Sequence, residues 1–373
     1  MKTSAKLEFR DVARGRALQA RLDHAMARAS RPVTVMHVCG SHEQAIARYG
    51  LRARFPRDLQ VQMGPGCPVC VTDAPEIDAC VALAQQGFHV VTYGDMLRVP
   101  GRAMSLDDAR AAGARVDVIY AATQAAEIAR ASEGPVVFFA TGFETTAVAT
   151  AAVLLSDPPP NLFVLSAHKW VPAAMEVVAS TPDTKIEGYL AAGHAATITG
   201  HAIFEPFVAR FRRPVVVAGF EPLDILSGLV LLVEQVLEAK AEVVNAFPRC
   251  VTREGNRRAL DALFRVFETS DGEWRGIARV PRGNLNLRSA FAGRDATVRF
   301  AAELAAAPAV VERADAAECR CGAIMTGLLQ PTDCRLFGKQ CRPEAPVGAC
   351  MVSTEGVCRI WHEHGVGRPA VSP

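Results

Sequence analysis

The fold is decided by Val33-Thr-Val-Met-His-Val-Cys39-Gly-Ser-His42-Glu43, which predicts a β-branched strand followed by a turn. The glycine after the strand permits a tight turn, so Cys39 and His42 are expected at the carboxyl end of the strand. In open α/β sheets, ligands bind at this edge. A thiolate and an imidazole three residues apart can fill two coordination positions of iron or zinc. A single buried cysteine is more often a small core residue, and the stretch alone leaves both interpretations open.

A second thiol site follows in Gly64-Pro-Gly-Cys67-Pro68-Val-Cys70. A C-x-x-C pair is typical of either a redox dithiol or half of a zinc site. Pro68 stiffens the loop, and a helix is expected to begin just beyond it, with Thr72 or Asp73 as its N-cap. The positive end of a helix lowers the pKa of a nearby thiol. No second C-x-x-C follows at zinc-finger spacing, so we expect a working dithiol.

The composition sets wider limits on function. A chain of 373 residues, half of them apolar, is expected to form two or three globular domains. The net charge of +2 is too small to indicate a nucleic-acid-binding surface. The first ten residues lack the apolar core of a signal peptide, and no apolar run reaches the length of a membrane span. We therefore expect a cytoplasmic protein, in which eleven cysteines indicate metal or redox chemistry rather than structural disulfides.

Predicted strands and helices alternate along the first two thirds of the chain. Strands are expected at 33–38, 88–93 and 116–120, with helices between them. The pattern begins again at Pro135 and continues with a long helix from Ile225 to about Phe247. Such alternation is typical of a parallel sheet with helices on both faces. The sequence therefore predicts an α/β fold made of two similar halves.

Polar residues follow many of these predicted strands. Each one alone is explained by helix capping, which contributes about 0.3–1 kcal/mol. Nine such residues together favour a shared cleft, whereas the absence of G-x-G-x-x-G argues against a dinucleotide site. The nine are Cys39, His42, Asp95, Thr141, Glu144, His168, His194, Glu221 and Asp224.

The last part of the chain is dense in cysteine and in turn-forming residues. Such a segment has little apolar surface, so a metal centre or cross-links are expected to hold it together. A zinc site needs at most four thiolates, and six are present. Four ligands of an iron–sulfur cluster plus a separate dithiol account better for six, although spacing alone does not say which cysteine does what. The six are Cys319, Cys321, Cys334, Cys341, Cys350 and Cys358.

These motifs together resemble the hydrogenase formation protein family HypD, which matures nickel–iron hydrogenases. The resemblance spans nearly the whole chain. One position departs from it, since Gln44 stands where the family often has a second histidine. The motifs that carry the resemblance are Cys39-Gly-Ser-His42, Gly64 to Cys70, Tyr93-Gly-Asp95-Met-Leu-Arg98, Gly142-Phe-Glu144-Thr-Thr146, Gly219-Phe-Glu221-Pro and the cysteines from Cys319 to Cys358.

The resemblance implies three domains and a specific cofactor. Two similar parallel-sheet α/β domains, 31–133 and 134–245, would face a cleft, and a smaller third domain, 1–30 with 246–373, would carry a [4Fe-4S] cluster. The cluster ligands would be Cys319, Cys334, Cys341 and Cys358, with Cys321 and Cys350 as a neighbouring redox pair.

The resemblance also implies a role as a redox-active assembly scaffold for the iron centre of the hydrogenase, with its two cyanides and one carbon monoxide. Cys39 would hold this transient iron, His42 would coordinate it or keep Cys39 deprotonated, and Asp95, Glu144 and His194 would shape the cleft. The dithiol of Cys67 and Cys70 would supply electrons. The small chaperone HypC would add a thiolate and HypE would deliver cyanide; the electron donor is not identified.

Two other functions remain open at this point. The chain could be an iron–sulfur dithiol–disulfide oxidoreductase that acts on a protein partner, with Cys39 only a core thiol. It could also be a zinc-stabilised binding scaffold without redox chemistry.

Overall fold

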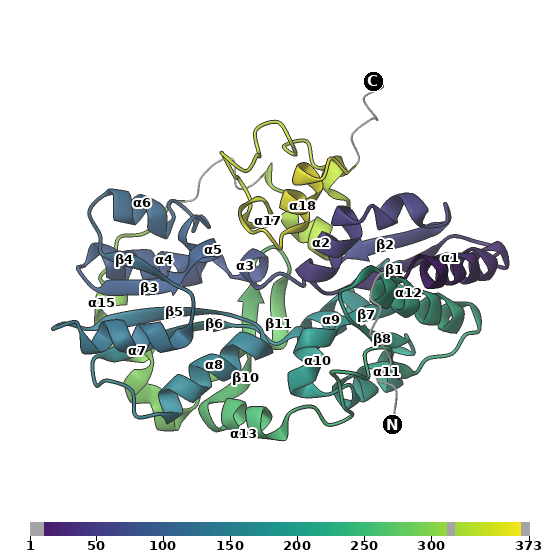
Figure 1. Cartoon of the computed structure of the whole chain (residues 1–373). Coiled ribbons are helices and arrows are strands. Elements are labelled where there is room, and N and C mark those ends of the chain that lie inside the picture. Colours follow the sequence, from purple (N-terminus) through teal and green to yellow (C-terminus); the bar gives the residue numbers. More distant parts are fainter. Residues whose placement is uncertain (1–10, 312–317, 367–373) are drawn as a thin grey trace.

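Two parallel sheets lie side by side in the computed structural model, which describes residues 11–311 and 318–366 (Figure 1). The cysteine-rich C-terminal segment lies over the junction between the two sheets, and the short helix α3 (Pro68–Val71) lies beneath it. The predicted α/β class with two parallel sheets is confirmed. An iron–sulfur cluster in the third part of the fold stays a prediction.

The first sheet has the strand order β2-β1-β7-β8-β9. Every residue of β1 is buried, because the strand lies between β2 and β7 in a sheet that helices cover. The strands are β1 (Val33–His37), β2 (Leu59–Met63), β7 (Gly188–Ala192), β8 (Val215–Ala218) and β9 (Val243–Asn245). The helices of this half are α1 (Val12–Ala27), α2 (Gly40–Arg48), η1 (Leu51–Arg54), α10 (Gly193–Thr199), η2 (Ala202–Phe204), α11 (Glu205–Phe211) and α12 (Pro222–Leu237).

The second sheet has the order β4-β3-β5-β6, and its core strand β5 is buried along its whole length. The strands are β3 (His89–Tyr93), β4 (Val116–Ile119), β5 (Val136–Gly142) and β6 (Leu162–His168). The helices are α4 (Ala74–Gln85), α5 (Gly94–Leu97), α6 (Leu106–Ala111), α7 (Ala122–Arg130) and α8 (Glu144–Leu155), and α9 (Val171–Ser180) leads back to the first sheet.

The strands are divided between the sheets differently from the predicted domains 31–133 and 134–245. Strands β1 and β2 share a sheet with β7 to β9, and β3 and β4 share the other with β5 and β6. The chain thus leaves the first sheet after Met63 and returns to it at Gly188. The boundary at residue 133 is wrong because periodicity shows that strands alternate with helices but not which strands pair.

The predicted third domain, 1–30 with 246–373, is also divided. Helix α1 packs on α12 of the first sheet, and the hairpin β10–β11 packs on β6 and α9. Residues 1–10, 312–317 and 367–373 of this range, including the first ten residues tested for a signal peptide, lie outside the described residues. The elements after β9 are α13 (Arg257–Val266), β10 (Phe267–Trp274), β11 (Ala278–Leu287), η3 (Ser289–Arg294), α14 (Ala296–Arg299), α15 (Ala301–Ala305), α16 (Cys321–Met325), η5 (Pro331–Asp333), α17 (Ala349–Val352) and α18 (Val357–Glu363).

The predicted long helix from Ile225 to about Phe247 ends early. Helix α12 stops at Leu237, the backbone of Ala239 turns with a positive φ of 52°, and β9 follows. The apolar content of this stretch suits both a buried helix and a buried edge strand, so composition did not separate them. Within the part of the chain that the structure describes, no helix has the length and apolar character needed to cross a bilayer.

Candidate functional site

Cys39 lies where strand β1 gives way to helix α2, as the sequence predicts, and it caps the N-terminus of that helix. Its thiol is 98% buried, and burial raises its pKa to about 12. The backbone N–H groups of His42 and Ser41 point at the sulfur and act in the opposite direction. A thiolate formed here would therefore be held by hydrogen bonds at a helix start, which is a site suited to an anion or to a metal-bound sulfur.

His194, not His42, supplies the imidazole nearest to the Cys39 sulfur, with 4.0 Å between Nδ1 and Sγ. His42 instead donates from Nε2 to the carbonyl oxygen of Gly219, at 3.0 Å. Burial, and then the charge of His37, lowers the pKa of His42 to about 3, so its ring is neutral. The expectation that His42 takes the Cys39 proton does not match this geometry, because the ring is turned toward the end of β8.

The second nitrogen of His42, Nδ1, is buried and has no hydrogen-bond partner among the residues that the structure describes. In a neutral ring that donates from Nε2, this nitrogen carries a free lone pair. Burying such a group without a partner costs free energy. Phe220 packs against the rings of both His42 and His194, with centroids 4.9 Å and 5.1 Å away. One thiol and two imidazoles thus lie near the carboxyl end of the first sheet. Sulfur and nitrogen are donors that iron accepts, but these three side chains do not converge closely enough to hold one ion by themselves.

The loop before the C-x-x-C pair lies directly on Cys39. Gly40 donates from its backbone N–H to the carbonyl oxygen of Gly66, at 3.2 Å. A Cβ at position 66 would lie 2.1 Å from the backbone nitrogen of Cys39, so only glycine permits this approach. Cys67 and Cys70 form a disulfide, and both are buried. The redox loop and the strand-end thiol therefore belong to one site.

The six C-terminal cysteines gather in one lobe. Cys321 and Cys350 lie with their sulfurs 2.6 Å apart, and Cys319 lies close enough to hydrogen-bond with Cys321. Burial raises the pKa of Cys358, and the thiols of Cys321, Cys319, Cys341 and Cys334 raise it further. Among the described residues, no three His, Cys, Asp or Glu side chains converge closely enough to hold a single metal ion.

A [4Fe-4S] cluster needs a wider spacing of its ligands than a single metal ion does, because each thiolate binds a different iron atom. The thiols of Cys319, Cys334, Cys341 and Cys358 lie around a common region, and Cys321 lies there too, because its thiol hydrogen-bonds with both Cys319 and Cys350. The lobe therefore offers enough cysteines for the cluster, and which four would bind it stays a prediction.

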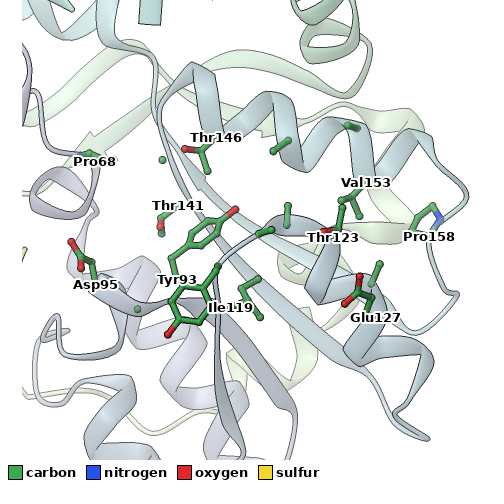
Figure 2. A pocket seen from close by; sticks show the side chains of 18 of the residues that line it. Pro68, Tyr93, Asp95, Ile119, Thr123, Glu127, Thr141, Thr146, Val153 and Pro158 are labelled. Atoms are coloured by element: carbon green, nitrogen blue, oxygen red, sulfur yellow. The ribbon is translucent and has the colours of Figure 1, made fainter. Parts of the chain in front are cut away.

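A pocket of about 1020 Å³ opens at the carboxyl edge of the second sheet (Figure 2). Tyr93 and Thr141 line it from the ends of β3 and β5, and Pro68 lines it from the disulfide loop. Asp95 lies at the same pocket and accepts a hydrogen bond from the Ser353 hydroxyl at 2.9 Å. The disulfide loop thus borders two sites: the strand-end thiol on one side and this pocket on the other.

Comparison with known proteins shows which family the chain belongs to. The family model described as "HypD: Hydrogenase formation hypA family" matches residues 14–365. The chain belongs to the HypD family. It is 42% identical over 377 residues to the hydrogenase maturation factor HypD of Azotobacter vinelandii, covering 98% of this chain and 97% of that protein.

Other relatives agree. The hydrogenase maturation factor HypD of Rhizobium leguminosarum bv. viciae is 40% identical, over 98% of this chain and 96% of its own length. A putative hydrogenase expression/formation protein of Methanocaldococcus jannaschii is 39% identical, over 88% and 91%. This HypD-family chain is therefore a hydrogenase maturation factor by its family and its relatives.

Other polar residues predicted at strand ends of the HypD-family chain have varied surroundings. Glu144 is buried, and its Oε1 accepts a hydrogen bond from the backbone N–H of Val171 at 3.1 Å. Its Oε2 has no hydrogen-bond partner within the described part of the chain, and burial raises the pKa of the carboxyl group to about 7. Asp224 pairs with Arg249, and His168 contacts Thr150. Their contacts match the capping and core roles that each residue alone would predict.

Sequence reasoning missed two residues that connect the site to the C-terminal lobe. Glu43 is fully buried, and it accepts hydrogen bonds from His37, Arg52 and Trp361 of α18. Glu355 accepts a hydrogen bond from the Ser41 hydroxyl at 3.4 Å. Glu43 directly follows the Cys-Gly-Ser-His motif, and this position was the one available signal. The contacts of Trp361 with Glu43 and of Glu355 with Ser41 each join segments more than 300 residues apart along the chain.

Proposed function

We propose that this HypD-family chain is a redox-active scaffold on which the iron centre of nickel–iron hydrogenase receives its two cyanides and carbon monoxide. One observation carries the proposal: Cys39, the Cys67–Cys70 disulfide and the Cys321–Cys350 pair lie on neighbouring segments, in that order. The strand-end thiol Cys39 lies under the loop of the Cys67–Cys70 disulfide, and helix α3 of that disulfide packs on α17, which carries Cys350 of the Cys321–Cys350 pair.

Cys39 holds the iron as cargo in this proposal. A thiolate is a soft ligand and suits low-spin iron that carries cyanide and carbon monoxide. His194 lies 4.0 Å from its sulfur and His42 has a neutral ring, whereas Asp95 and Glu144 act from farther away in the cleft. The groove of about 300 Å³ between α2 and Glu355, bordered by Phe220, is the opening through which the chaperone HypC brings its own thiolate.

The C-terminal lobe supplies electrons. Cys319, Cys334, Cys341 and Cys358 would hold the [4Fe-4S] cluster, which when bound passes electrons one at a time. Cys321 and Cys350 would take up two electrons and two protons as a dithiol and reduce the Cys67–Cys70 disulfide by thiol–disulfide exchange. An external reductant of low potential then reduces Cys321 and Cys350 again through the cluster. HypE delivers the cyanide.

The infrared spectrum of the anaerobic complex with HypC tests this proposal. Bound cyanide and carbon monoxide should give bands from the wild-type complex. Cys39→Ala should remove them while the chain stays folded and keeps four irons in its C-terminal lobe. A Cys39→Ala protein that still yields a cyanide-ligated iron complex would refute the assignment.

One observation favours a second function, that of an iron–sulfur dithiol–disulfide oxidoreductase acting on a protein partner. Cys39 packs with Ala192, Ala195 and Phe220 in a small apolar cluster, as a core thiol would. In that case the wild-type complex would bind only the cluster iron and show no cyanide bands, while a protein disulfide would still be reduced.

A further inference from the structure

Arg275 occupies the turn of the hairpin β10–β11 and reaches into the junction between the redox loop and the cysteine lobe. Its backbone N–H donates to the carbonyl oxygen of Val71 at 3.1 Å. Its side chain donates from Nε to the carbonyl oxygen of Thr72 at 2.9 Å and from a terminal nitrogen to that of Pro100 at 2.6 Å. Val71 and Thr72 directly follow Cys70, so this one residue holds the C-terminal end of the disulfide helix α3.

The same hairpin turn also contacts the segment that carries Cys321, a member of the Cys321–Cys350 pair. A Cβ at Gly322 would lie 1.9 Å from the carbonyl oxygen of Gly276, so the two backbones touch next to Cys321. Cys321 in turn lies against Cys350 on α17, and α17 packs on α3. The hairpin turn therefore fixes the two sulfur pairs relative to each other.

The charge of Arg275 lacks a conventional partner. Within residues 11–311 and 318–366, no carboxylate lies within ion-pair distance of its guanidinium, although the side chain is largely enclosed. Burial lowers its pKa, and the nearby Cys321, Asp73, Cys319 and Cys350 raise it. A buried cation is costly unless anions or hydrogen-bond acceptors surround it, and here the acceptors are the carbonyl oxygens of Thr72 and Pro100.

We propose that Arg275 is a positioning residue of the thiol relay, which holds the Cys67–Cys70 disulfide against the Cys321–Cys350 pair and favours the reduced form of Cys67 and Cys70. This role rests on the proposed function, since it assumes that the two pairs exchange electrons. In the exchange, the sulfur–hydrogen bonds of Cys321 and Cys350 break and a disulfide forms between them. The Cys67–Cys70 bond breaks, and the two protons end on Cys67 and Cys70.

Loss of the cation should favour the Cys67–Cys70 disulfide, because a nearby cation stabilises the thiolate fraction of the reduced pair, whereas a disulfide carries no charge. A tenfold change in the dithiol–disulfide equilibrium corresponds to a shift of about 30 mV for this two-electron couple. The effects of the position and of the charge of Arg275 can be separated with Arg275→Lys. Lysine keeps the positive charge, but it lacks the planar guanidinium that donates to two carbonyl oxygens at once.

The first experiment measures the equilibrium of the Cys67–Cys70 pair in the full-length protein. Anaerobic samples are equilibrated in dithiothreitol buffers of graded ratio, alkylated, and analysed by mass spectrometry of the peptide with Cys67 and Cys70. Arg275→Gln should shift the equilibrium about tenfold toward the disulfide, and Arg275→Lys should shift it less. Arg279→Gln on the same hairpin, where the side chain is 68% exposed and paired with Asp271, should match wild type.

The second experiment measures position. In a chain with Cys67→Ser and Cys321→Ser, diamide should join Cys70 to Cys350. Both Arg275→Lys and Gly322→Ala should lower the yield about tenfold, the latter without removing a charge. Circular dichroism establishes that each variant is folded, and Arg275→Lys replaces Arg275→Gln in the first experiment if the latter is not.

A wild-type equilibrium in the Arg275 variants would overturn the proposal, as would an unchanged cross-link yield in both Arg275→Lys and Gly322→Ala. Failure of wild-type Cys70 and Cys350 to cross-link would refute the relay in the proposed function and the positioning role with it. Absence of cyanide bands, with the Arg275 effects present, would refute the scaffold function and leave the positioning role intact.

Discussion

Glu43 receives hydrogen bonds from three side chains of different segments and lies four residues after Cys39. Burial alone would raise its pKa, but the Arg52 guanidinium and the hydrogen bond from His37 lower it to about 2. A carboxyl group whose folded pKa lies below its unfolded value of about 4.5 stabilises the fold above that pH. That stability is lost as the pH falls from about 4.5 toward 2.

We predict that Glu43→Gln lowers the free energy of unfolding at pH 7 by about 3 kcal/mol, because it leaves Arg52 without its buried partner. The variant should also lose less stability than wild type between pH 5 and pH 3. Urea unfolding at several pH values measures both effects. Glu205→Gln, in an exposed pair with Arg253, is the control and should cost less than about 1 kcal/mol. Equal acid sensitivity of wild type and Glu43→Gln would contradict the prediction.

At this scale, the sequence located Cys39 correctly but not its imidazole neighbour. The strand–glycine–turn pattern is local, so it predicts where the thiol lies. The direction of the His42 ring depends on the carbonyls of Ala218 and Gly219, and the approach of His194 depends on β7 pairing with β1. These contacts come from distant segments and leave no local signal.

The loop from Gly64 to Cys70 is the element that joins the strand-end thiol to the disulfide. We predict that Gly66→Ala lowers the free energy of unfolding by about 1–3 kcal/mol, since the new methyl group would meet the backbone of Val38 and Cys39, which cannot move aside. It should also make Cys39 faster to alkylate. Gly134→Ala is the control, because a Cβ there meets no atom within 4 Å. Wild-type stability and wild-type alkylation in Gly66→Ala would show that the loop contact is not close in solution.

Most strands and helices of the first two thirds were predictable, and two strands were not. Helix α4 begins at the predicted N-cap Asp73, with Pro75 in its first turn. Strand β2 was missed because Gln60 and Gln62 interrupt its apolar residues, and the three-residue β9 was missed because it falls inside the predicted long helix. The hairpin that carries Arg275 gives no clear strand signal in the sequence, since Pro281 and Gly283 interrupt its second strand.

At the scale of the whole molecule, the C-terminal lobe is the part that the proposed [4Fe-4S] cluster would cross-link. Serine at any of Cys319, Cys334, Cys341 or Cys358 should therefore remove the iron and loosen the lobe. Cys321→Ser and Cys350→Ser should keep four irons and the brown colour, and these two variants serve as the matched controls. Iron analysis and visible absorbance after anaerobic purification measure this. A full cluster in Cys334→Ser would rule out the ligand assignment.

The fold class was predictable from the sequence at this scale, whereas the division of strands between the sheets was not. Alternation of strands and helices predicts parallel sheets whatever the pairing order. The pairing of β1 with β7, and of β3 with β5, depends on helices that carry the chain across the junction twice.

This crossing has a consequence for how the protein is made. Strand β1 needs β7 as its neighbour, yet β7 begins at Gly188, about 125 residues after β2 ends at Met63. A ribosome that adds about 5–20 residues per second requires roughly 6–25 s to cover that distance. During this interval the apolar edge of β1, with Cys39 next to it, waits unpaired while the second sheet is synthesised. The thiol that we propose to hold iron is thus open to nascent-chain chaperones and oxidants until the first sheet closes over it.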